Sequence, residues 1–269
     1  MPAFVDLTNV THTYGGQAGG SATLAVEDLT IRVNQGEFSA VVGPSGCGKS
    51  TLMKLATGLQ FPQKGTIMVD GAKVERPVKI AGMAFQNPVM LPWRTVLENI
   101  MLPLEIVEPH RSQLRSQKAA YVEKAEALLT TVGLKGMGQK YPWQLSGGMQ
   151  QRASLCRALI HDPKLLMLDE PFGALDAFTR EELWCVMRDL HQLKQFTVLL
   201  VTHDLREAVF LADRIFCMSN RPGKIIAERE VTLPRPRDLE VTYSQDFSAI
   251  VHDLRGLIKE ARIEPAATG

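Results

Sequence analysis

The stretch GPSGCGKS at residues 43–50 has the residue types and spacing needed to bind phosphate. It matches G-x-x-x-x-G-K-[ST], follows the apolar run FSAVV at 38–42 and precedes the helix-forming stretch TLMKLATGL. Glycines let such a loop curl so that successive amides point at phosphate oxygens, and the helix N-terminus adds partial positive charge. Lys49 is expected to reach the β- and γ-phosphates, and the Ser50 hydroxyl to ligate Mg²⁺. The residues predicted to bind the nucleotide here are Gly43, Pro44, Ser45, Gly46, Cys47, Gly48, Lys49, Ser50 and Thr51.

A pair of carboxylates follows a second apolar run. LLMLDEP at 165–171 puts Asp169 and Glu170 at the end of a predicted strand. In an open parallel sheet the carboxyl ends of strands line the ligand crevice. We expect Asp169 to hold Mg²⁺ and Glu170 to polarise the water that attacks the γ-phosphate, a role worth about 10²–10⁴-fold in rate. Such a pair also occurs in solvated turns, and the phosphate-binding loop elsewhere in the chain favours the catalytic interpretation.

Two further polar side chains follow predicted strands. His203 comes after TVLLVT at 197–202, where it could donate a hydrogen bond to charge developing on the γ-phosphate. Gln86 follows the short run AGMAF at 81–85, and its amide could bridge Mg²⁺ and the attacking water. A lone histidine is more often structural or solvent-exposed, and a lone glutamine is often a surface amide, so both predictions depend on the neighbouring motifs.

The elements that must position these residues form an α/β pattern. Short β-rich runs fill the first part of the chain, helix-forming residues prevail from about 87 to 158, and strands then alternate with helices. The continuous apolar runs at 165–168 and 197–201 are typical of buried parallel strands. GQAGGS at 16–21 predicts a flexible hairpin tip. A helix is expected to end at Gly133, and a final amphipathic helix is predicted in the tail. Its apolar face would carry Phe247, Ile250, Val251, Leu254, Leu257 and Ile258.

Composition narrows the class of protein. The chain has 269 residues, 45% of them hydrophobic, with a net charge of +1. That charge gives no general attraction to nucleic acid. The apolar runs are too short to cross a bilayer, and the N-terminus has no evident signal peptide. The four scattered cysteines have no C-x-x-C spacing, which favours a reduced, cytosolic chain.

A second glycine-rich stretch, LSGGMQQR at 145–152, raises the question of why one ATPase needs two such loops. Taken together, the motifs GPSGCGKST, AFQNP, LSGGMQQR, LLMLDEP, GALD and VTHD occur in the order found in the ATP-binding subunits of ABC transporters. The chain resembles that family from residue 4 to about 260.

The resemblance implies a P-loop NTPase fold of the α/β class: a RecA-like core with an antiparallel β subdomain, plus an inserted α-helical subdomain. It implies that two subunits dock head to tail, so that each LSGG closes over ATP held by the partner. Ser146, Gly147 and Gly148 would present donors in trans to the γ-phosphate. Many members have Gln where this chain has Met149, which weakens any prediction for that position.

The resemblance also assigns less specific positions. Tyr14 in HTYGG matches the aromatic residue that stacks on adenine, and Asp176 in GALD matches the loop along the dimer interface. The segment at 90–105, which contains Trp93, would contribute both to the subdomain core and to the groove that receives a short helix of a membrane subunit. The metal-binding set implied for Mg²⁺ is Ser50, Gln86 and Asp169.

The implied domain organisation has four segments. Residues 1–86 form the N-terminal part of the nucleotide-binding core with its antiparallel β subdomain. Residues 87–160 form the helical subdomain that carries LSGG. Residues 161–235 complete the core, and residues 236–269 form a C-terminal helical tail.

The finer resemblance is to the nitrate, sulfonate and taurine importer group, carried by LPWRTVLENIMLPLE, GALDAFTREELW and SNRPGKIIAEREVTLPRPRD. It implies an ATP- and Mg²⁺-dependent subunit bound peripherally at the cytoplasmic face of the membrane. Its expected partners are two transmembrane permease subunits, a second copy of itself and, indirectly, a periplasmic or lipid-anchored solute-binding protein. Small anions are the expected solutes, and pyrimidine precursors, phthalate-like acids and cyanate remain open.

Two other classes of function fit the motifs less well. A soluble ABC-type ATPase acting on chromosomes would insert long heptad segments before LSGG, yet only about sixty residues separate Gln86 from Leu145. A ribosome-type protein would fuse two cassettes, and no basic stripe for nucleic acid is present. A non-catalytic binding module is disfavoured because the full catalytic set is in place: Lys49, Asp169, Glu170 and His203.

Overall fold

The computed structural model describes residues 3–15, 22–173 and 175–263. The chain divides into two compact units, residues 1–78 with 191–269, and residues 79–190. The four functional segments expected from the sequence are a different division and stay a prediction. The predicted hairpin tip at 16–21 lies outside the described residues. Among the described helices, none has the length and apolar character needed to span a membrane.

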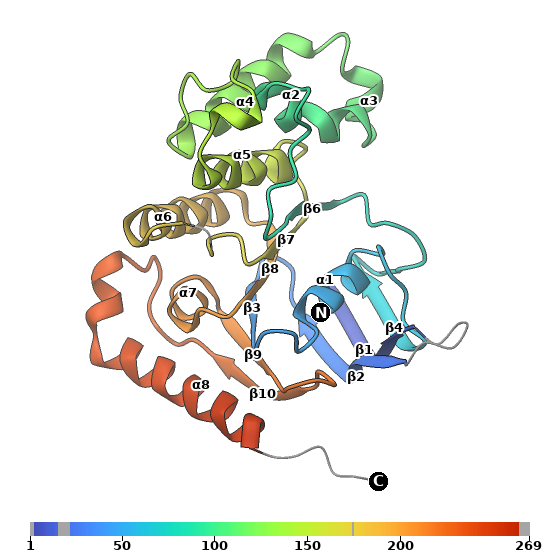
Figure 1. Cartoon of the computed structure of the whole chain (residues 1–269), viewed down its shortest axis with the longest axis vertical. Helices are drawn as coiled ribbons and strands as arrows, with labels where there is room; N and C mark the ends of the chain where they lie inside the picture. The colour runs from blue at the N-terminus through green and yellow to red at the C-terminus, as the bar shows by residue number, and fades with distance from the viewer. Residues whose placement is uncertain (1–2, 16–21, 174, 264–269) are drawn as a thin grey trace. The chain divides into compact units, whose positions relative to one another are not determined.

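The first unit contains an antiparallel sheet in the order β2-β1-β4-β5 (Figure 1). Burial alternates along the second half of β2, as expected for a strand with one face on the core. The pairing of β1 with β2 shifts register at several points, so the two long strands bend. The strands are β1 (Val5–Tyr14), β2 (Thr23–Val33), β4 (Lys64–Val69) and β5 (Ala72–Lys73).

The same unit contains the strands that lead to the phosphate-binding loop. Strand β3 pairs in parallel with both β8 and β9, and β10 joins β9 antiparallel. Every residue of β3 and β8 is buried, which confirms the interpretation of their continuous apolar runs. The strands are β3 (Phe38–Val42), β8 (Thr197–Thr202), β9 (Arg214–Met218) and β10 (Ile225–Glu230). The helices are α1 (Lys49–Ala56), α7 (Leu205–Leu211), η3 (Leu239–Tyr243) and α8 (Gln245–Ile263).

The C-terminal helix α8 packs on α7, β9 and β10 (Figure 1). Phe247 and Leu254 on its apolar face are fully buried, which confirms the predicted amphipathic tail helix. The segment before it is held by Arg237, a buried guanidinium that donates to the carbonyls of Val209, Phe210 and Ala212. Those carbonyls end α7, so the arginine caps a helix C-terminus.

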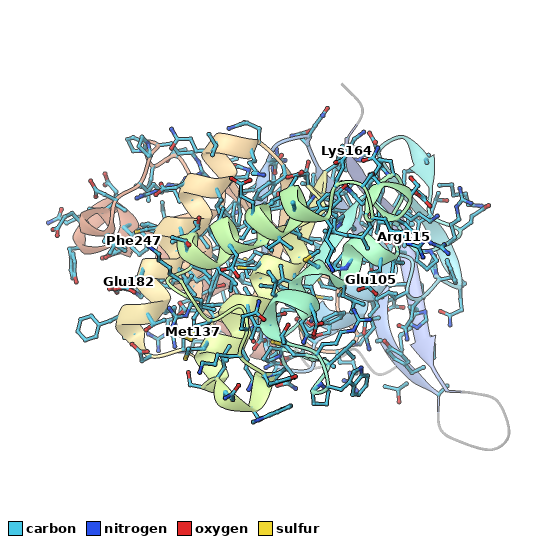
Figure 2. The ribbon with its side chains drawn as sticks, turned by 90° about the horizontal axis from the view of Figure 1, so that it is seen from above. Glu105, Arg115, Met137, Lys164, Glu182 and Phe247 are labelled. Atoms are coloured by element: carbon cyan, nitrogen blue, oxygen red, sulfur yellow. The ribbon has the colours of Figure 1, made fainter. Side chains whose placement is uncertain are left out.

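The second unit is mainly helical around one parallel pair of strands, β6 (Ala81–Ala84) and β7 (Leu165–Asp169). The C-terminus of α4 is followed by Gly133 at φ +73°, close to the predicted helix end. Arg94 is paired with Glu105, which is labelled in Figure 2. The helices are α2 (Val96–Met101), η1 (Leu102–Glu105), α3 (His110–Gln113), α4 (Lys118–Thr131), η2 (Pro142–Gln144), α5 (Gly147–Leu159) and α6 (Ala177–Lys194), the last of which continues into the first unit.

Candidate functional site

The phosphate-binding loop joins β3 to α1, as predicted. Gly46 at φ +76° and Gly48 at φ +111° lie in the left-handed region, which glycine occupies without strain. A Cβ on Gly48 would also lie 2.8 Å from the Ala25 carbonyl oxygen and from Val26 Cγ1. Glycine is therefore required at position 48 both by backbone conformation and by the close approach of β2.

Lys49 is buried inside this loop. Its Nζ donates to the carbonyl oxygens of Gly43 and Pro44, both at 2.9 Å. The ammonium group is thus held at the centre of the curled backbone, where a phosphate would be bound. Anionic phosphate oxygens accept stronger hydrogen bonds than neutral carbonyls, so the loop is prepared to exchange these contacts for a nucleotide.

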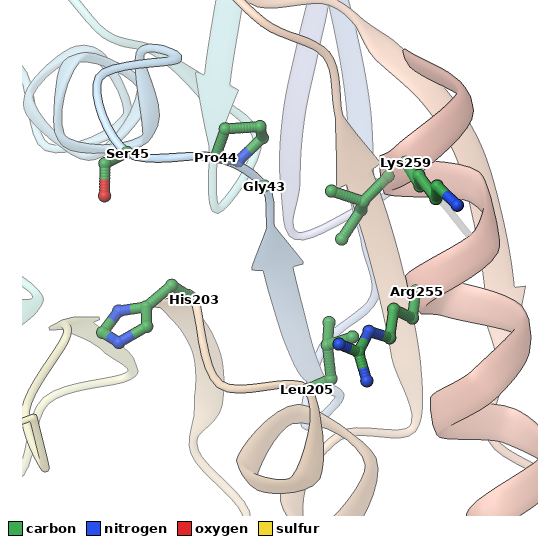
Figure 3. Close-up of a pocket in the computed structure, with 8 residues that line it drawn as sticks. Gly43, Pro44, Ser45, His203, Leu205, Arg255 and Lys259 are labelled. Carbon is green, nitrogen blue, oxygen red and sulfur yellow. The ribbon is translucent and has the colours of Figure 1, made fainter. Parts of the chain in front are cut away.

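A cavity of about 530 Å³ opens beside the loop. Gly43, Pro44 and Ser45 line it together with His203, so the first unit brings the loop and the predicted histidine to one site (Figure 3). The sequence reasoning did not anticipate that α8 closes the other side with Arg255, Ile258 and Lys259. In Figure 3, Arg255 reaches from α8 toward Leu205.

Tyr14 lies at the end of β1, beside α1. Its hydroxyl donates to Gln60 Oε1 at 2.6 Å and lies 3.2 Å from Thr51 Oγ1. The ring meets the imidazole of His12 edge-on, with centroids 4.9 Å apart. These contacts place the ring next to the helix that starts at the loop. Stacking on adenine stays a prediction.

Cys47 is buried within the loop, and burial raises the pKa of its thiol, with nearby Lys49 opposing that shift. The raised pKa keeps the group a neutral thiol at physiological pH. A neutral buried thiol packs like a small apolar side chain, so we assign Cys47 no chemistry of its own.

The second unit brings two other predicted residues together. Gln86 Nε2 donates to Glu170 Oε2 at 3.1 Å, although the two residues are 84 positions apart. Asp169 is the buried last residue of β7, and Glu170 follows at φ +47°, a left-handed conformation rare outside glycine. The bend turns the chain out of the strand immediately after Asp169. Carboxylate and amide oxygens are donors that suit Mg²⁺, so this set fits the predicted metal chemically.

The LSGG loop has a different geometry from the phosphate-binding loop. Ser146 is the N-cap of α5, and its side chain accepts a hydrogen bond from the Met149 amide at 3.3 Å. Ser146 and Gly147 are exposed, and a Cβ on Gly147 would meet no atom within 4 Å. Because Met149 contributes its backbone amide to the cap, any non-proline residue at this position can supply the same bond.

Sequence reasoning missed the glutamines that follow LSGG. Gln150 Nε2 donates to the carbonyl of Pro142 at 3.0 Å, and the buried Gln151 donates to that of Phe85 at 3.0 Å. Arg157 donates to the carbonyl of Val89 at 2.6 Å. Side chains of α5 therefore hold the chain on both sides of Gln86. The only sequence signal was a run of polar residues at the start of a helix that is otherwise well buried.

Asp176 sits immediately before α6. Its Oδ1 accepts the Thr179 amide at 3.0 Å, and hydrogen bonds to Thr179 lower the pKa of the carboxyl. Arg180 donates to the carbonyl of Leu175 at 2.9 Å. The carboxylate thus caps a helix, and its predicted place along a dimer interface stays a prediction.

A buried lysine held in a glycine loop between a parallel strand and a helix defines a P-loop nucleotide hydrolase. The family model described as ABC transporter matches residues 26–173, and the chain belongs to this family. It is an ATP-binding cassette and an ATP hydrolase.

Similarity to individual members of the family supports that assignment. The chain is 44% identical over 219 residues to an aliphatic sulfonates import ATP-binding protein of Bacillus licheniformis, covering 81% of this chain and 82% of the relative. It is 40% identical to a nitrate import ATP-binding protein of Synechocystis, covering 90% and 87%. It is 39% identical to a taurine import ATP-binding protein of Shigella sonnei, covering 85% and 86%.

Among solved structures, the ATP-binding cassette MJ0796, a dimer in a post-hydrolysis state with ADP and Pi, superimposes with a TM-score of 0.73. That comparison covers 86% of this chain and 100% of the cassette, at 30% identity. The likeness confirms the predicted P-loop NTPase fold class.

Proposed function

We propose that this chain is the ATPase subunit of an importer for a small anionic solute of the nitrate, sulfonate or taurine kind. The observation that carries the proposal is the likeness of 39–44% to three ATP-binding proteins, each of which is named as an import component for one of these solutes. The same names argue against the alternative of a soluble ATPase that is not coupled to transport.

The proposed reaction gives a role to each residue that the sequence predicts to be catalytic. Lys49 exchanges its two carbonyl acceptors for phosphate oxygens and compensates their charge. Glu170 acts as the general base on the attacking water, and the amide of Gln86 holds that carboxylate in orientation. His203, which lines the same cavity as the loop, donates to the γ-phosphate.

We propose that Ser50, Gln86 and Asp169 hold Mg²⁺. When bound, the metal supplies positive charge to the phosphates. Ser50 is the first residue after the loop lysine, and Asp169 ends β7. These hydroxyl, amide and carboxylate donors match the preference of Mg²⁺ for oxygen ligands.

We propose that two copies of the chain dock head to tail, and that Ser146, Gly147 and Gly148 of one copy complete the ATP site of the other. The exposed N-terminus of α5 supports this arrangement, because its unfilled space can receive a phosphate held elsewhere. The likeness to a cassette described as dimeric supports it further.

A groove of about 370 Å³ in the second unit is proposed as the docking site for a membrane subunit. Phe85, Val89 and Ile106 line it and are exposed, and apolar surface of this kind is typical of protein contacts. Trp93, four positions after Val89 in the chain, is 71% exposed. The proposed assembly has two permease subunits, two copies of this chain and a solute-binding protein, with this chain peripheral at the cytoplasmic face.

The proposal is tested by co-expressing the chain with candidate membrane and solute-binding subunits from the same organism, and measuring ATPase activity in proteoliposomes. Nitrate, taurine and an alkanesulfonate are compared with a neutral sugar of similar size. We expect one of the anions to raise the turnover rate several-fold. Stimulation by the sugar alone, or by none of the four, would contradict the proposal.

The groove is tested by a double variant, Val89→Ser with Ile106→Ser. Leu193→Ser is the matched control, since Leu193 is 79% exposed and does not line the groove. We expect the double variant to lose co-purification with the membrane subunits while it keeps ATP binding. Equal co-purification of all variants would assign the groove to other partners.

A further inference from the structure

The loop between β9 and β10, with sequence SNRPGK at 219–224, packs directly against the phosphate-binding loop. The Gly223 amide donates to the carbonyl of Ala25 at 3.0 Å, and the Glu27 amide donates to that of Gly223 at 3.1 Å. A Cβ on Gly223 would lie 2.2 Å from the Cys47 carbonyl oxygen. The backbone at 223 therefore touches the backbone of the phosphate-binding loop with no room for a side chain.

This packing places Arg221 beside Gly46. Arg221 Nε and Nη2 both donate to the Gly46 carbonyl oxygen, at 3.1 Å and 3.0 Å. The two residues are 175 positions apart, and Arg221 is itself exposed. A cationic group with two donors on one oxygen makes a stronger and more directional contact than a neutral donor.

The contact sets the orientation of one peptide plane. In a planar trans peptide the C=O of one residue and the N–H of the next point in opposite directions. Because Arg221 holds the Gly46 oxygen on the outside, the Cys47 amide faces inward. It donates a long bond of 3.4 Å to the Pro44 carbonyl oxygen, the same oxygen that accepts from Lys49 Nζ. The Cys47 amide and the Lys49 ammonium therefore converge on the same space.

We propose that Arg221 is a positioning residue of the nucleotide site, which fixes the Gly46–Cys47 peptide so that the Cys47 amide faces the phosphates. Arg221 acts through the loop and not by touching the nucleotide. Gly46 needs this external support because glycine has no side chain to restrict its backbone, and its φ of +76° is one of several values that glycine adopts freely.

The test measures binding of ADP and AMP to the full chain carrying Arg221→Ala, Arg221→Lys or Lys224→Ala. ADP places a phosphate in the loop, whereas AMP lacks the β-phosphate that the loop cradles. Lys224 is the matched control: it is a cation of the same loop, and its ammonium group pairs with Glu27 at 2.9 Å. Thermal unfolding without nucleotide is recorded for each variant.

For Arg221→Ala we expect ADP affinity to fall about 5- to 10-fold, as for loss of a charge-assisted hydrogen bond, and AMP affinity to stay unchanged. Arg221→Lys should recover part of the ADP affinity because its ammonium retains one donor. Lys224→Ala should leave both affinities unchanged. Unchanged ADP binding in Arg221→Ala overturns the proposal, as does an equal loss for ADP and AMP. An equal effect in Lys224→Ala would assign the loss to general electrostatics and overturn it too. If Arg221→Ala unfolds at a lower temperature than the wild type, the proposal is tested on Arg221→Lys instead. The deciding quantity is again the loss of ADP affinity relative to AMP affinity.

Discussion

The chain has two glycine-rich loops that each precede a helix and contain serine, yet they are built for opposite purposes. The loop at 43–50 is curled, with two glycines at positive φ and a buried lysine at its centre. The loop at 145–148 leads into α5 through an ordinary N-cap, with Ser146 at φ −63° and ψ 162°. The first encloses a space, and the second leaves a helix end open.

This difference in backbone geometry explains why one loop cannot replace the other. A curled loop surrounds a phosphate and can bind it without other help. An exposed helix N-terminus offers a few amides and a partial charge on one side only, which suits a ligand that is already held by another surface. The open geometry at Ser146 is what the trans arrangement requires.

The largest difference between the loops should appear on removal of the lysine. Lys49→Ala deletes the cation at the centre of the curled loop, and we expect ATP affinity to fall at least about 100-fold, or about 2.7 kcal/mol. Hydrolysis should be lost as well. Lys54→Ala, an exposed lysine of the same helix, is the control. Calorimetric titration with ATP measures the affinity of both variants. Near-normal affinity in Lys49→Ala would mean that this loop does not bind the nucleotide.

Glu170→Gln separates nucleotide binding by the phosphate-binding loop from ATP hydrolysis. A glutamine keeps an oxygen that can accept from Gln86 Nε2 but cannot take a proton from water. We expect turnover at least about 10²-fold slower with ATP binding nearly unchanged. Steady-state hydrolysis and nucleotide titration are compared with the exposed control Glu182→Gln. A turnover rate near that of the wild type would mean that another residue acts as the general base.

Alanine in place of glycine should distinguish the two loops by stability. Gly48→Ala forces a side chain into φ +111° and against the Ala25 carbonyl, so we expect a loss of about 2 kcal/mol in the free energy of unfolding. Gly147→Ala meets open space at the start of a helix, and we expect no loss or a gain of up to about 1 kcal/mol. Urea unfolding without nucleotide measures both. Equal losses would mean that the LSGG glycines are also required by the fold.

The smallest effect, a factor of two, tests whether the open loop acts in trans. A mixed dimer is made from a Lys49→Ala subunit and a Ser146→Arg subunit, both in the Glu170→Gln background. If Ser146 serves the partner, both lesions fall in one composite site and about one ATP per dimer is trapped. If it serves its own subunit, both sites are damaged and none is trapped.

Differently tagged subunits restrict the mixed-dimer measurement to heterodimers, and the parent Glu170→Gln dimer, expected to trap two ATP, is the control. Trapping of none by the mixed dimer would contradict the trans arrangement when each single-variant mixture with the parent still traps ATP. Those mixtures reveal whether the two sites depend on each other.

Much of this protein could be predicted from local sequence. The apolar runs of β3, β7 and β8 and the amphipathic face of α8 are properties of neighbours in the chain, and so is the G-x-x-x-x-G-K-S loop. A strand or helix pattern depends on residues two to four positions apart, which a single sequence displays. Strand β1 was predicted only indirectly, as one arm of the hairpin with its tip at 16–21, because the alternation begun by Val5 and Leu7 breaks where the register shifts.

Only the tertiary structure decided what supports the site. Arg221 on Gly46, Gln151 on the Phe85 carbonyl and the cations of α8 beside the loop all join segments that are distant in the chain. The contacts of Arg221 and Gln151 end on backbone carbonyls, which every residue possesses, so the side chain of the partner residue gives no sign of the contact in the sequence. The sequence therefore determines which groups can do the chemistry, while the folded backbone decides which side chains from distant segments hold those groups in place.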